Sequence, residues 1–322
     1  MPAGKKIVVY DDLEPRIQKE IENNLPDGFI LRFVSPKSGE SALAEVADAD
    51  YMVVWAGYVP ANVVSAGKRL RLIQKIGEGT DRIDVATARS MGIPVAKTTG
   101  SNGASVADFA TLLMLSTIRW LPRAHNSMMD GEWLKFELRW GAYDMLGKQV
   151  GIVGMGKIGR RVARRVQGFE STVVYHDAIR LPESEEERLD VRYMPLDELM
   201  ATSDIISLHV PLNSSTEGMI GRKQIGLMKL TAILVNTCRG AVVDEQALYE
   251  ALRDKRIRGA GLDCFVKEPL PAGHPFRTLD NVVLTPHCAG GTEDSGLEGI
   301  KKAYSNILRL DADMSIDPAD LV

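Results

Sequence analysis

A Gly-x-Gly-x-x-Gly segment near the middle of the chain constrains the fold more than any other feature. An apolar run leads into Gly154, Gly156 and Gly159, and a basic helical stretch follows over residues 160–167. This order predicts a strand, a tight turn and a helix, which is the context that gives the motif its meaning. The turn and the N-terminus of the helix can hold a pyrophosphate. The segment therefore predicts a doubly wound α/β domain that binds a dinucleotide.

An acidic residue closes the next predicted strand. Residues 172–176 are apolar and end on Asp177, eighteen residues after Gly159. A carboxylate there accepts hydrogen bonds from a ribose 2′-hydroxyl and repels a 2′-phosphate. Ala178 supplies no cation beside it, although Arg180 lies close enough to soften the discrimination. We therefore expect NAD as the cofactor in preference to NADP.

Length and charge narrow the class of protein. A chain of 322 residues is too long for one compact core, so two domains are expected. The net charge of −4 gives no electrostatic footprint for nucleic acid or an anionic membrane. The N-terminal residues show no signal peptide, and no apolar run approaches membrane-spanning length. Three cysteines without a CxxC pair indicate a reduced, cytoplasmic setting.

Strand and helix patterns alternate twice along the chain. The first hundred residues predict a parallel sheet covered by helices. A second array predicts six parallel strands, at residues 149–153, 172–176, 205–209, 233–236, 260–264 and 282–285. The acidic segment Leu181–Leu189 reads as a solvated loop, and residues 294–310 as a helix that returns to the first domain.

The middle of the chain holds a segment that fits neither sheet. An apolar stretch, Ser105–Trp120, predicts a buried helix that stops at Pro122. The next segment, Arg123–Leu146, carries two tryptophans and a phenylalanine among charged residues. We expect it to be an arm that covers another surface.

Polar residues at strand ends are the candidates for chemistry, because ligands bind beyond the carboxyl ends of parallel strands. Position alone does not separate His209 from His287, whereas His176 lies too near the adenosine half of the cofactor. Arg239 follows another strand and could bind a carboxylate or form a structural salt bridge. Glu268 could orient a histidine and favour its charged form, or be an exposed loop acid.

Taken together, these motifs resemble the D-isomer-specific 2-hydroxyacid dehydrogenase family over nearly the whole chain. The matching segments are Gly154-x-Gly156-x-x-Gly159, His209-Val210-Pro211-Leu212, Asn236-Thr237-Cys238-Arg239-Gly240, Asp263-x-x-x-x-Glu268-Pro269 and Thr285-Pro286-His287. Residues 79–84 also look like the substrate-side loop of the family. The resemblance implies NAD(H)-dependent interconversion of a small 2-keto acid and its D-2-hydroxy acid. It also implies a Rossmann domain plus a discontinuous flavodoxin-like substrate domain.

The resemblance implies Arg239, Glu268 and His287 as the catalytic set, with His287 as general acid and base. Together with the glycine motif it implies cofactor contacts by Gly154, Gly156, Lys157, Ile158, Gly159, Asp177, His209, Val210, Pro211, Thr237, Cys238, Arg239, Asp263, His287 and Gly290. Asp263 is expected to meet the nicotinamide carboxamide. Substrate contacts are expected from Trp55, Gly77, Glu78, Gly79, Arg239 and His287, and no metal is expected.

The sequence also predicts the bounds of the two domains and a homodimer. Residues 1–99 and 291–322 are expected to form the substrate-binding domain, and residues 100–290 the NAD-binding domain. A helix and arm over residues 105–146 are expected to form a homodimer, because their apolar content exceeds what one protomer should expose. No nucleic-acid or membrane partner is expected.

Departures from the family pattern bear on the substrate. Trp55 stands where phosphoglycerate dehydrogenases carry an arginine for the substrate phosphate, and no regulatory domain is expected after residue 322. Glu268 stands where the formate dehydrogenase branch carries glutamine. We therefore expect a small unphosphorylated acid such as glyoxylate or hydroxypyruvate. The alternatives are phosphite oxidation by the same three residues and a non-enzymatic NADH-sensing corepressor.

Each of the three cysteines adjoins a candidate site residue. Cys238 precedes Arg239, Cys264 follows Asp263 and Cys288 follows His287. A neighbouring cation could favour the thiolate, in which case alkylating reagents would inactivate the protein and NADH would slow the loss. The alternative is that the thiols are small core side chains.

Overall fold

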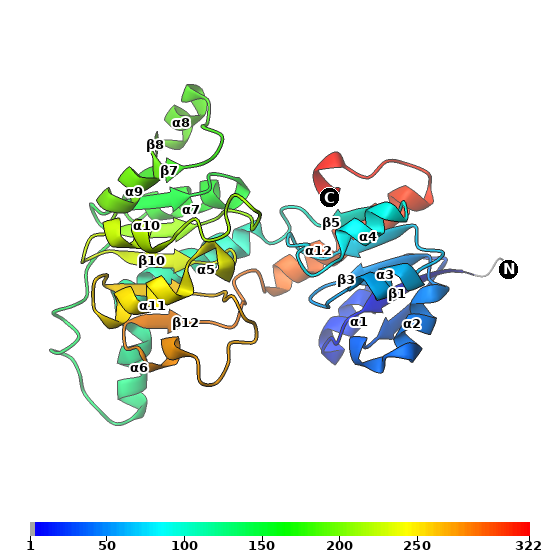
Figure 1. The fold of residues 1–322 in the computed structure, drawn as a ribbon, viewed down its shortest axis with the longest axis horizontal. Helices are drawn as coiled ribbons and strands as arrows, with labels where there is room; N and C mark the ends of the chain where they lie inside the picture. Colours follow the sequence, from blue (N-terminus) through cyan, green and yellow to red (C-terminus); the bar gives the residue numbers. More distant parts are fainter. Residues whose placement is uncertain (1–3) are drawn as a thin grey trace. The chain divides into compact units, whose positions relative to one another are not determined.

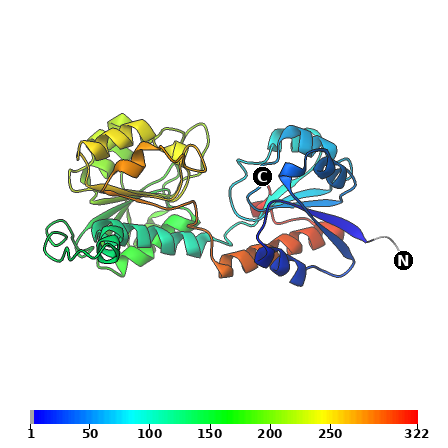
Figure 2. The same ribbon diagram turned by 90° about the horizontal axis from the view of Figure 1, so that it is seen from below.

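The computed structural model describes residues 4–322, which divide into two units. The first unit consists of Met1–Asn102 and Gly291–Val322, and the second of Gly103–Gly290. Each unit has its own parallel sheet with helices on both faces (Figures 1 and 2). The predicted α/β class with two separate sheets is therefore confirmed.

The first unit is built on a five-stranded parallel sheet in the order β2-β1-β3-β4-β5, which is the flavodoxin-like order. Its strands are β1 (Lys5–Tyr10), β2 (Phe29–Val34), β3 (Tyr51–Val54), β4 (Leu72–Lys75) and β5 (Val95–Lys97). Its helices are α1 (Pro15–Asn23), α2 (Glu40–Ala47), α3 (Ala61–Ala66), α4 (Val85–Ser90) and α12 (Glu293–Asp311), with short 3-10 turns at Pro36–Ser38 and Pro318–Asp320.

Alternation along each strand supplies both faces of this sheet, because successive side chains point to opposite sides. Ile7 and Val9 of β1 pack in a core with α1 and α12. Val8 and Tyr10 pack in the other core, with α2, α3 and α4. Figure 2 shows these two helix layers on opposite sides of the sheet. The C-terminal helix α12 therefore completes a core that begins at the N-terminus.

The second unit is built on a seven-stranded parallel sheet in the order β12-β11-β10-β9-β6-β7-β8. Its strands are β6 (Gln149–Val153), β7 (Thr172–His176), β8 (Arg192–Tyr193), β9 (Ile205–Leu208), β10 (Ile233–Asn236), β11 (Gly259–Leu262) and β12 (Val282–Leu284). Its helices are α5 (Gly103–Ile118), α6 (Leu121–Met129), α7 (Lys157–Gln167), α8 (Glu183–Leu189), α9 (Leu196–Thr202), α10 (Arg222–Leu227) and α11 (Glu245–Arg253), with 3-10 turns at Gly240–Val242 and Pro275–Thr278.

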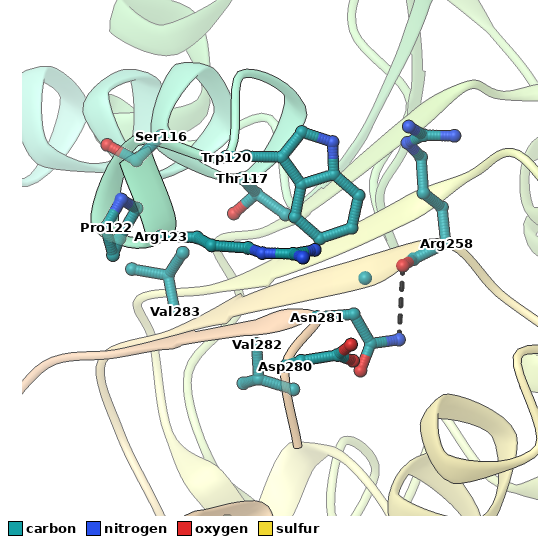
Figure 3. A pocket seen from close by; sticks show the side chains of 11 residues that line it. Ser116, Thr117, Trp120, Pro122, Arg123, Arg258, Asp280, Asn281, Val282 and Val283 are labelled. Atoms are coloured by element: carbon teal, nitrogen blue, oxygen red, sulfur yellow. Dashed lines mark hydrogen bonds between the residues drawn. The ribbon is translucent and has the colours of Figure 1, made fainter. Parts of the chain in front are cut away.

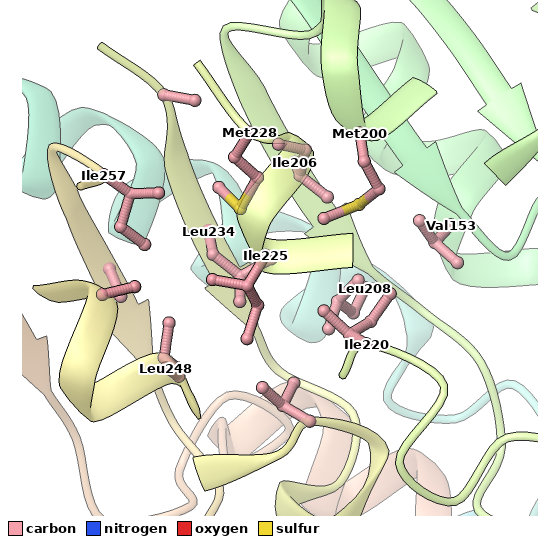
Figure 4. Packing of buried hydrophobic residues seen from close by; sticks show 14 of the residues in the cluster. Val153, Met200, Ile206, Leu208, Ile220, Ile225, Met228, Leu234, Leu248 and Ile257 are labelled. Carbon is pink, nitrogen blue, oxygen red and sulfur yellow. The ribbon is translucent and has the colours of Figure 1, made fainter. Parts of the chain in front are cut away.

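Two hydrophobic cores cover the faces of the second sheet. One packs α5 and α7 against β6, β7, β9 and β10. The other packs α9, α10 and α11 against the opposite face, and Figure 4 shows part of it, including Leu208, Leu234 and Leu248. The chain runs from β6 outward to β7 and β8, and then returns to β9 on the other side of β6. This reversal places a topological switch point between the carboxyl ends of β6 and β9, where doubly wound sheets bind their ligands.

Two predictions for this sheet were wrong. The expected six strands are seven, because the two-residue β8 pairs with β7 at Val174 and Tyr175. The acidic segment expected to be a solvated loop, residues 181–189, contains α8. Glu186 of α8 is buried and accepts hydrogen bonds from Arg180 and Tyr175. Tertiary contacts therefore order a segment whose sequence has no apolar periodicity.

The apolar helix α5 ends earlier than expected. It stops at Ile118, and Trp120 takes a left-handed conformation with φ of 55°. Pro122 lies in the first turn of α6, where a missing N–H costs nothing, so it begins a helix rather than ending one. Within residues 4–322 no single helix meets the length and hydropathy needed to cross a membrane; α5 and α6 meet it only together, across a bend of 66°.

A small cavity lies at the edge of the sheet where the strands begin. It has a volume of about 30 Å³ and lies beside Gly259 and Val282, the first residues of β11 and β12. Figure 3 shows Asn281 beneath it, donating to the carbonyl oxygen of Arg258 at 3.2 Å. Ligands of such sheets bind at the opposite edge, so this cavity lies apart from the site described next.

Candidate active site

The turn between β6 and α7 is shaped by its glycines. Gly154 has φ of +98°, and a Cβ on it would lie 2.5 Å from the carbonyl oxygen of His209. A Cβ on Gly159 would lie 2.1 Å from the carbonyl oxygen of Gly154. Gly156, in contrast, would place a Cβ in open space, with no atom within 4 Å. The first and third glycines thus allow tight packing, and the second leaves room beside the backbone.

The N-terminus of α7 lies at the open space beside Gly156 and has no side-chain cap. Gly156 is the N-cap residue and makes no side-chain hydrogen bond to the helix, which begins with Lys157 and Ile158. Uncapped N–H groups and the positive end of the helix dipole suit a phosphate.

Asp177 closes β7 beside the same turn. Its Oδ2 accepts from the backbone N–H of Met155 at 2.7 Å, and its Oδ1 accepts from that of Ile179 at 3.1 Å. The carboxylate is therefore fixed next to the glycine turn. Its remaining acceptor capacity suits hydroxyl donors.

His209 follows β9 on the other side of the switch point. Its Nε2 lies 2.8 Å from Ser207 Oγ, and its buried Nδ1 has no partner within residues 4–322. Burial lowers the pKa of His209 to about 4, so the ring is neutral. Val210 lies against Gly154, and the carbonyl oxygen of Pro211 accepts from Thr216 at 2.6 Å. His209 is therefore a neutral histidine beside the switch point, hydrogen-bonded to Ser207.

The turn after β10 carries Arg239. Asn236 is buried, its Nδ2 donates to the carbonyl oxygen of Arg239 at 2.9 Å, and its Oδ1 accepts from the N–H of Cys238 at 3.0 Å. Gly240 is pressed against the backbone of Phe265, which a Cβ would meet at 2.0 Å. Asn236 was not predicted as a site residue, yet it fixes the backbone from which the arginine extends.

His287 and Glu268 form a hydrogen-bonded pair. His287 Nδ1 lies 2.9 Å from Oε1 and 2.8 Å from Oε2 of Glu268. Since a carboxylate only accepts, Nδ1 carries the proton and Nε2 is the nitrogen that remains for chemistry. Glu268 Oε1 also accepts from the N–H of Phe265 at 3.1 Å. The ring is 41% exposed, so it can reach a ligand.

Asp263 holds the loop that carries His287. Its fully buried carboxylate accepts from Thr285 Oγ1 at 2.6 Å and from the N–H groups of Cys288 and Ala289 at 3.0 and 2.9 Å. Within this structure Asp263 thus positions the histidine loop. The half-buried Gly290 ends the same loop.

Four of the expected substrate residues, Trp55, Gly77, Glu78 and Gly79, follow the carboxyl ends of β3 and β4 in the first unit. Asp11 Oδ2 accepts from the N–H groups of Trp55, Ala56 and Gly57 at 2.7–2.9 Å. Asp11 directly follows β1, so its place at a strand end was the signal that sequence reasoning overlooked. The carboxylate fixes the loop that carries Trp55.

The neighbouring loop is fixed in a similar way. Gly77 has φ of +109°, and its N–H donates to Thr98 Oγ1 at 2.7 Å. Glu78 Oε1 accepts from the N–H of Gly100 at 2.5 Å. The side chain of Glu78 is thus turned to its own unit, and Gly79 follows it in the loop.

The expectation that the site favours a thiolate was wrong. Burial raises the pKa of Cys238 to about 11, and it also raises the pKa values of Cys264 and Cys288. Desolvation therefore outweighs any neighbouring cation, and the protonated form is favoured at all three thiols.

The residues present fit a dinucleotide. The open space at Gly156 and the uncapped helix suit a pyrophosphate. The buried Oγ1 of Thr237 and Nδ1 of His209 have no partner within residues 4–322, and both lie at strand ends beside the switch point. The same residues contain no group of three or more His, Cys, Asp or Glu side chains arranged to hold a metal ion.

Comparison with known proteins gives a consistent result. Residues 111–289 match the family model described as the D-isomer specific 2-hydroxyacid dehydrogenase NAD binding domain. The chain is 42% identical to a glyoxylate reductase of Korarchaeum cryptofilum, over 85% of this chain and 83% of that protein. It is 40% identical to a hydroxypyruvate reductase of Thermotoga maritima, over 81% and 86%. It is also 40% identical to a D-3-phosphoglycerate dehydrogenase of Methanocaldococcus jannaschii, over 80% of this chain but 48% of that protein.

A solved structure agrees over the whole chain. The TT0316 protein of Thermus thermophilus superposes with a TM-score of 0.86 at 32% identity, covering 98% of this chain and 99% of that one. The resemblance inferred from the motifs is confirmed. The chain belongs to the D-isomer specific 2-hydroxyacid dehydrogenase family and is an NAD-dependent oxidoreductase.

Proposed function

We propose that this protein reduces a small unphosphorylated 2-keto acid to the D-2-hydroxy acid with NADH. The observation that carries the proposal is the His287–Glu268 pair, with Nδ1 held by the carboxylate and Nε2 left for the substrate. The imidazole is fixed, partly exposed and located where the strands of the second sheet end. It therefore suits proton transfer to a ligand oxygen.

The proposed mechanism follows from the charge that develops. NADH, when bound, supplies the hydride that reaches the carbonyl carbon. As negative charge grows on the carbonyl oxygen, protonated His287 donates its Nε2 proton to that oxygen. Glu268 keeps the ring in place and stabilises its charged form. In the oxidation direction the neutral Nε2 takes the proton from the hydroxyl group.

Arg239 is proposed to bind the substrate carboxylate and to polarise the carbonyl group. Its guanidinium is a permanent cation with a planar set of donors. A fixed cation stabilises the transition state when it lies where charge develops. Asn236 and Gly240 support this role, because they fix the backbone on both sides of the arginine.

The substrate class is proposed from the first unit. Trp55 offers an apolar surface and no partner for a phosphate group, and its ring packs against Gly296 of α12. The N–H groups near Glu78 and Gly79 are proposed to hold the substrate carboxylate. The relatives named glyoxylate reductase and hydroxypyruvate reductase support an unphosphorylated acid. We propose that the first unit binds this substrate and that the second binds NAD.

A homodimer and a cytoplasmic location complete the proposal. Helix α5 buries most of its apolar residues within its own unit, so it no longer supports a dimer by itself. The segment after it exposes Trp133, Phe136 and Trp140, with exposed fractions of 72%, 64% and 90%. Exposed aromatic residues in one segment are typical of a protein–protein interface. Three free cysteines are compatible with a reducing compartment.

The test is NADH oxidation with glyoxylate, hydroxypyruvate, 3-phosphohydroxypyruvate and a short aliphatic 2-keto acid. We expect the highest kcat/KM with glyoxylate or hydroxypyruvate. A higher kcat/KM with 3-phosphohydroxypyruvate would overturn the substrate class. NAD reduction by phosphite alone would replace the reaction, and NADH binding without any turnover would favour a sensor.

A further inference from the structure

The cofactor site contains one arginine whose position suits a 2′-phosphate. Arg180 lies three residues after Asp177, in the loop that leaves β7. In nucleotide-binding sheets, an arginine near this point accommodates the 2′-phosphate of NADP. On sequence alone, Arg180 should therefore weaken the preference for NAD.

The structure gives this arginine another partner. Its Nε and Nη2 donate to the two carboxylate oxygens of Glu186 at 2.8 and 2.9 Å, which is a bidentate pair. The guanidinium also lies over the ring of Tyr193, 5.4 Å from its centroid. The charge of Arg180 and the N–H groups of its guanidinium therefore interact with Glu186 and Tyr193, and not with Asp177.

Glu186 is a buried residue, whereas the Arg180 side chain that pairs with it is exposed. Its side chain is 10% exposed, and Oε1 also accepts from Tyr175 Oη at 2.6 Å. Tyr175 Oη in turn accepts from the N–H of Leu181 at 2.8 Å. The hydrogen bonds that Glu186 accepts from Arg180 and Tyr175 hold the pKa of Glu186 at about 2, so the carboxylate stays charged at working pH.

The same helix engages a second arginine beside the glycine turn. Arg160 donates from Nε to the carbonyl oxygen of Met155 at 3.2 Å and from Nη1 to Glu185 at 2.7 Å. Glu185 and Glu186 are neighbours on α8. The acidic helix thus neutralises two cations that flank the ribose-binding carboxylate of Asp177.

We propose that α8 makes the cofactor site selective for NAD, with Glu186 as a specificity-determining residue that withholds Arg180 from a 2′-phosphate. Asp177 repels the phosphate directly, and Glu186 removes the cation that would compensate for this repulsion. Both carboxylates thus favour NAD over NADP. Asp177 lies at the start of the loop that follows β7, and Glu186 lies in the helix that follows this loop.

The test measures nucleotide binding without any keto acid, so its outcome is independent of the proposed substrate. Adenosine 2′,5′-bisphosphate and 5′-AMP are titrated into the protein by calorimetry, and NADPH and NADH by fluorescence. The variants are Glu186→Gln, Arg180→Met and the double variant. Glu187→Gln is the matched control, because it removes one negative charge from the exposed next position of α8.

Glu186→Gln should tighten adenosine 2′,5′-bisphosphate about tenfold, as expected for one released bidentate partner, and leave 5′-AMP unchanged. The gain should disappear in the double variant and be absent from Glu187→Gln. Arg180→Met alone should change the affinity for the bisphosphate less than twofold, because the wild-type arginine is already engaged.

Three results would overturn the proposal. The first is an equal gain in Glu187→Gln, which would indicate general electrostatics. The second is a gain that persists without Arg180. The third is a loss of several-fold in Arg180→Met alone, which would show that the arginine already serves the phosphate. This last variant tests the proposal even if Glu186→Gln fails to fold, since the Arg180 side chain is 61% exposed and Glu186 keeps its hydrogen bond from Tyr175 without it.

Discussion

At the scale of single residues, His287 is held by more contacts than a surface histidine needs. Its φ of +52° is a left-handed conformation that few residues other than glycine adopt. Its N–H donates to Thr285 O at 3.1 Å, and Asp263 ties down the residues on both sides of it. Strained residues that their surroundings hold in place are concentrated at functional sites, which agrees with the proposed role.

The pairing of His287 with Glu268 predicts a loss of turnover without a loss of NADH binding. In Glu268→Gln the Nδ1–H of His287 loses the carboxylate that holds it, so the imidazole is no longer fixed for proton transfer. We expect kcat to fall while the Kd for NADH changes little. Steady-state rates and NADH titration measure the two quantities. Turnover equal to that of wild type, with NADH bound normally, would exclude the proposed role of the pair.

The buried ring of His209 predicts a pH-dependent stability. Its folded-state pKa of about 4 lies below the value of 6.5 of an ordinary histidine. Between these values the unfolded chain binds a proton that the folded chain does not, so stability falls as the pH drops from 6.5 to 4. The contribution lost between pH 7.5 and 4.5 is roughly 2–3 kcal/mol. In His209→Gln, urea unfolding should show a correspondingly smaller loss, and an equal loss would contradict the assignment.

Residues of the site differ in how far the sequence predicts them. Gly154, Arg239 and His287 stand in local motifs, and motifs identify them directly. Asn236 and Ser207 contact Arg239 and His209 within a short segment, in a geometry that only the folded backbone defines. Asp11 contacts the loop of Trp55, which lies far from it in the sequence. The raised pKa of Cys238 depends on its burial in the folded protein. From the sequence, the adjacent Arg239 suggested a lowered pKa instead.

At the scale of elements, the β6–α7 turn separates the structural glycines from the binding one. Gly159→Ala would place a methyl group 2.1 Å from a backbone oxygen, so the free energy of unfolding should fall by about 1–3 kcal/mol. Gly156→Ala meets no atom within 4 Å and should keep the stability of the wild type while weakening NADH binding. Denaturant melts and NADH titration of both variants test this contrast. Equal destabilisation of the two variants would refute it.

The elements that sequence reasoning missed share a physical cause. Most of the predicted strands, such as β3, β9 and β10, are apolar runs buried along their whole length, which the composition reveals. Helix α8 has few apolar residues and depends on Arg160, Arg180 and Tyr175 for its place. Strand β8 has two residues and no periodicity to detect. Pro122 was predicted to end a helix. Proline occurs both after the end of a helix and in the first turn of one, so the residue type alone does not distinguish the two positions.

At the scale of the whole molecule, the exposed aromatic segment predicts a dimer. Phe136→Ser and Trp140→Ser together should weaken association at least tenfold, because each buried aromatic side chain contributes about 1.5–3 kcal/mol. Light scattering across a concentration series measures the change. Phe169→Ser is the control, since Phe169 is an exposed aromatic of the same unit outside this segment. A wild-type monomer at micromolar concentration would exclude the dimer.

The proposed function depends on His287 as the proton donor in NADH-dependent reduction of a 2-keto acid. The most direct measurement compares wild type and His287→Ala by NADH oxidation with glyoxylate and hydroxypyruvate, alongside the Kd for NADH. We predict that kcat falls roughly 10²–10⁴-fold, as for the loss of a general acid, while the Kd for NADH changes little. Turnover within tenfold of wild type in the variant, with NADH bound normally, would contradict it.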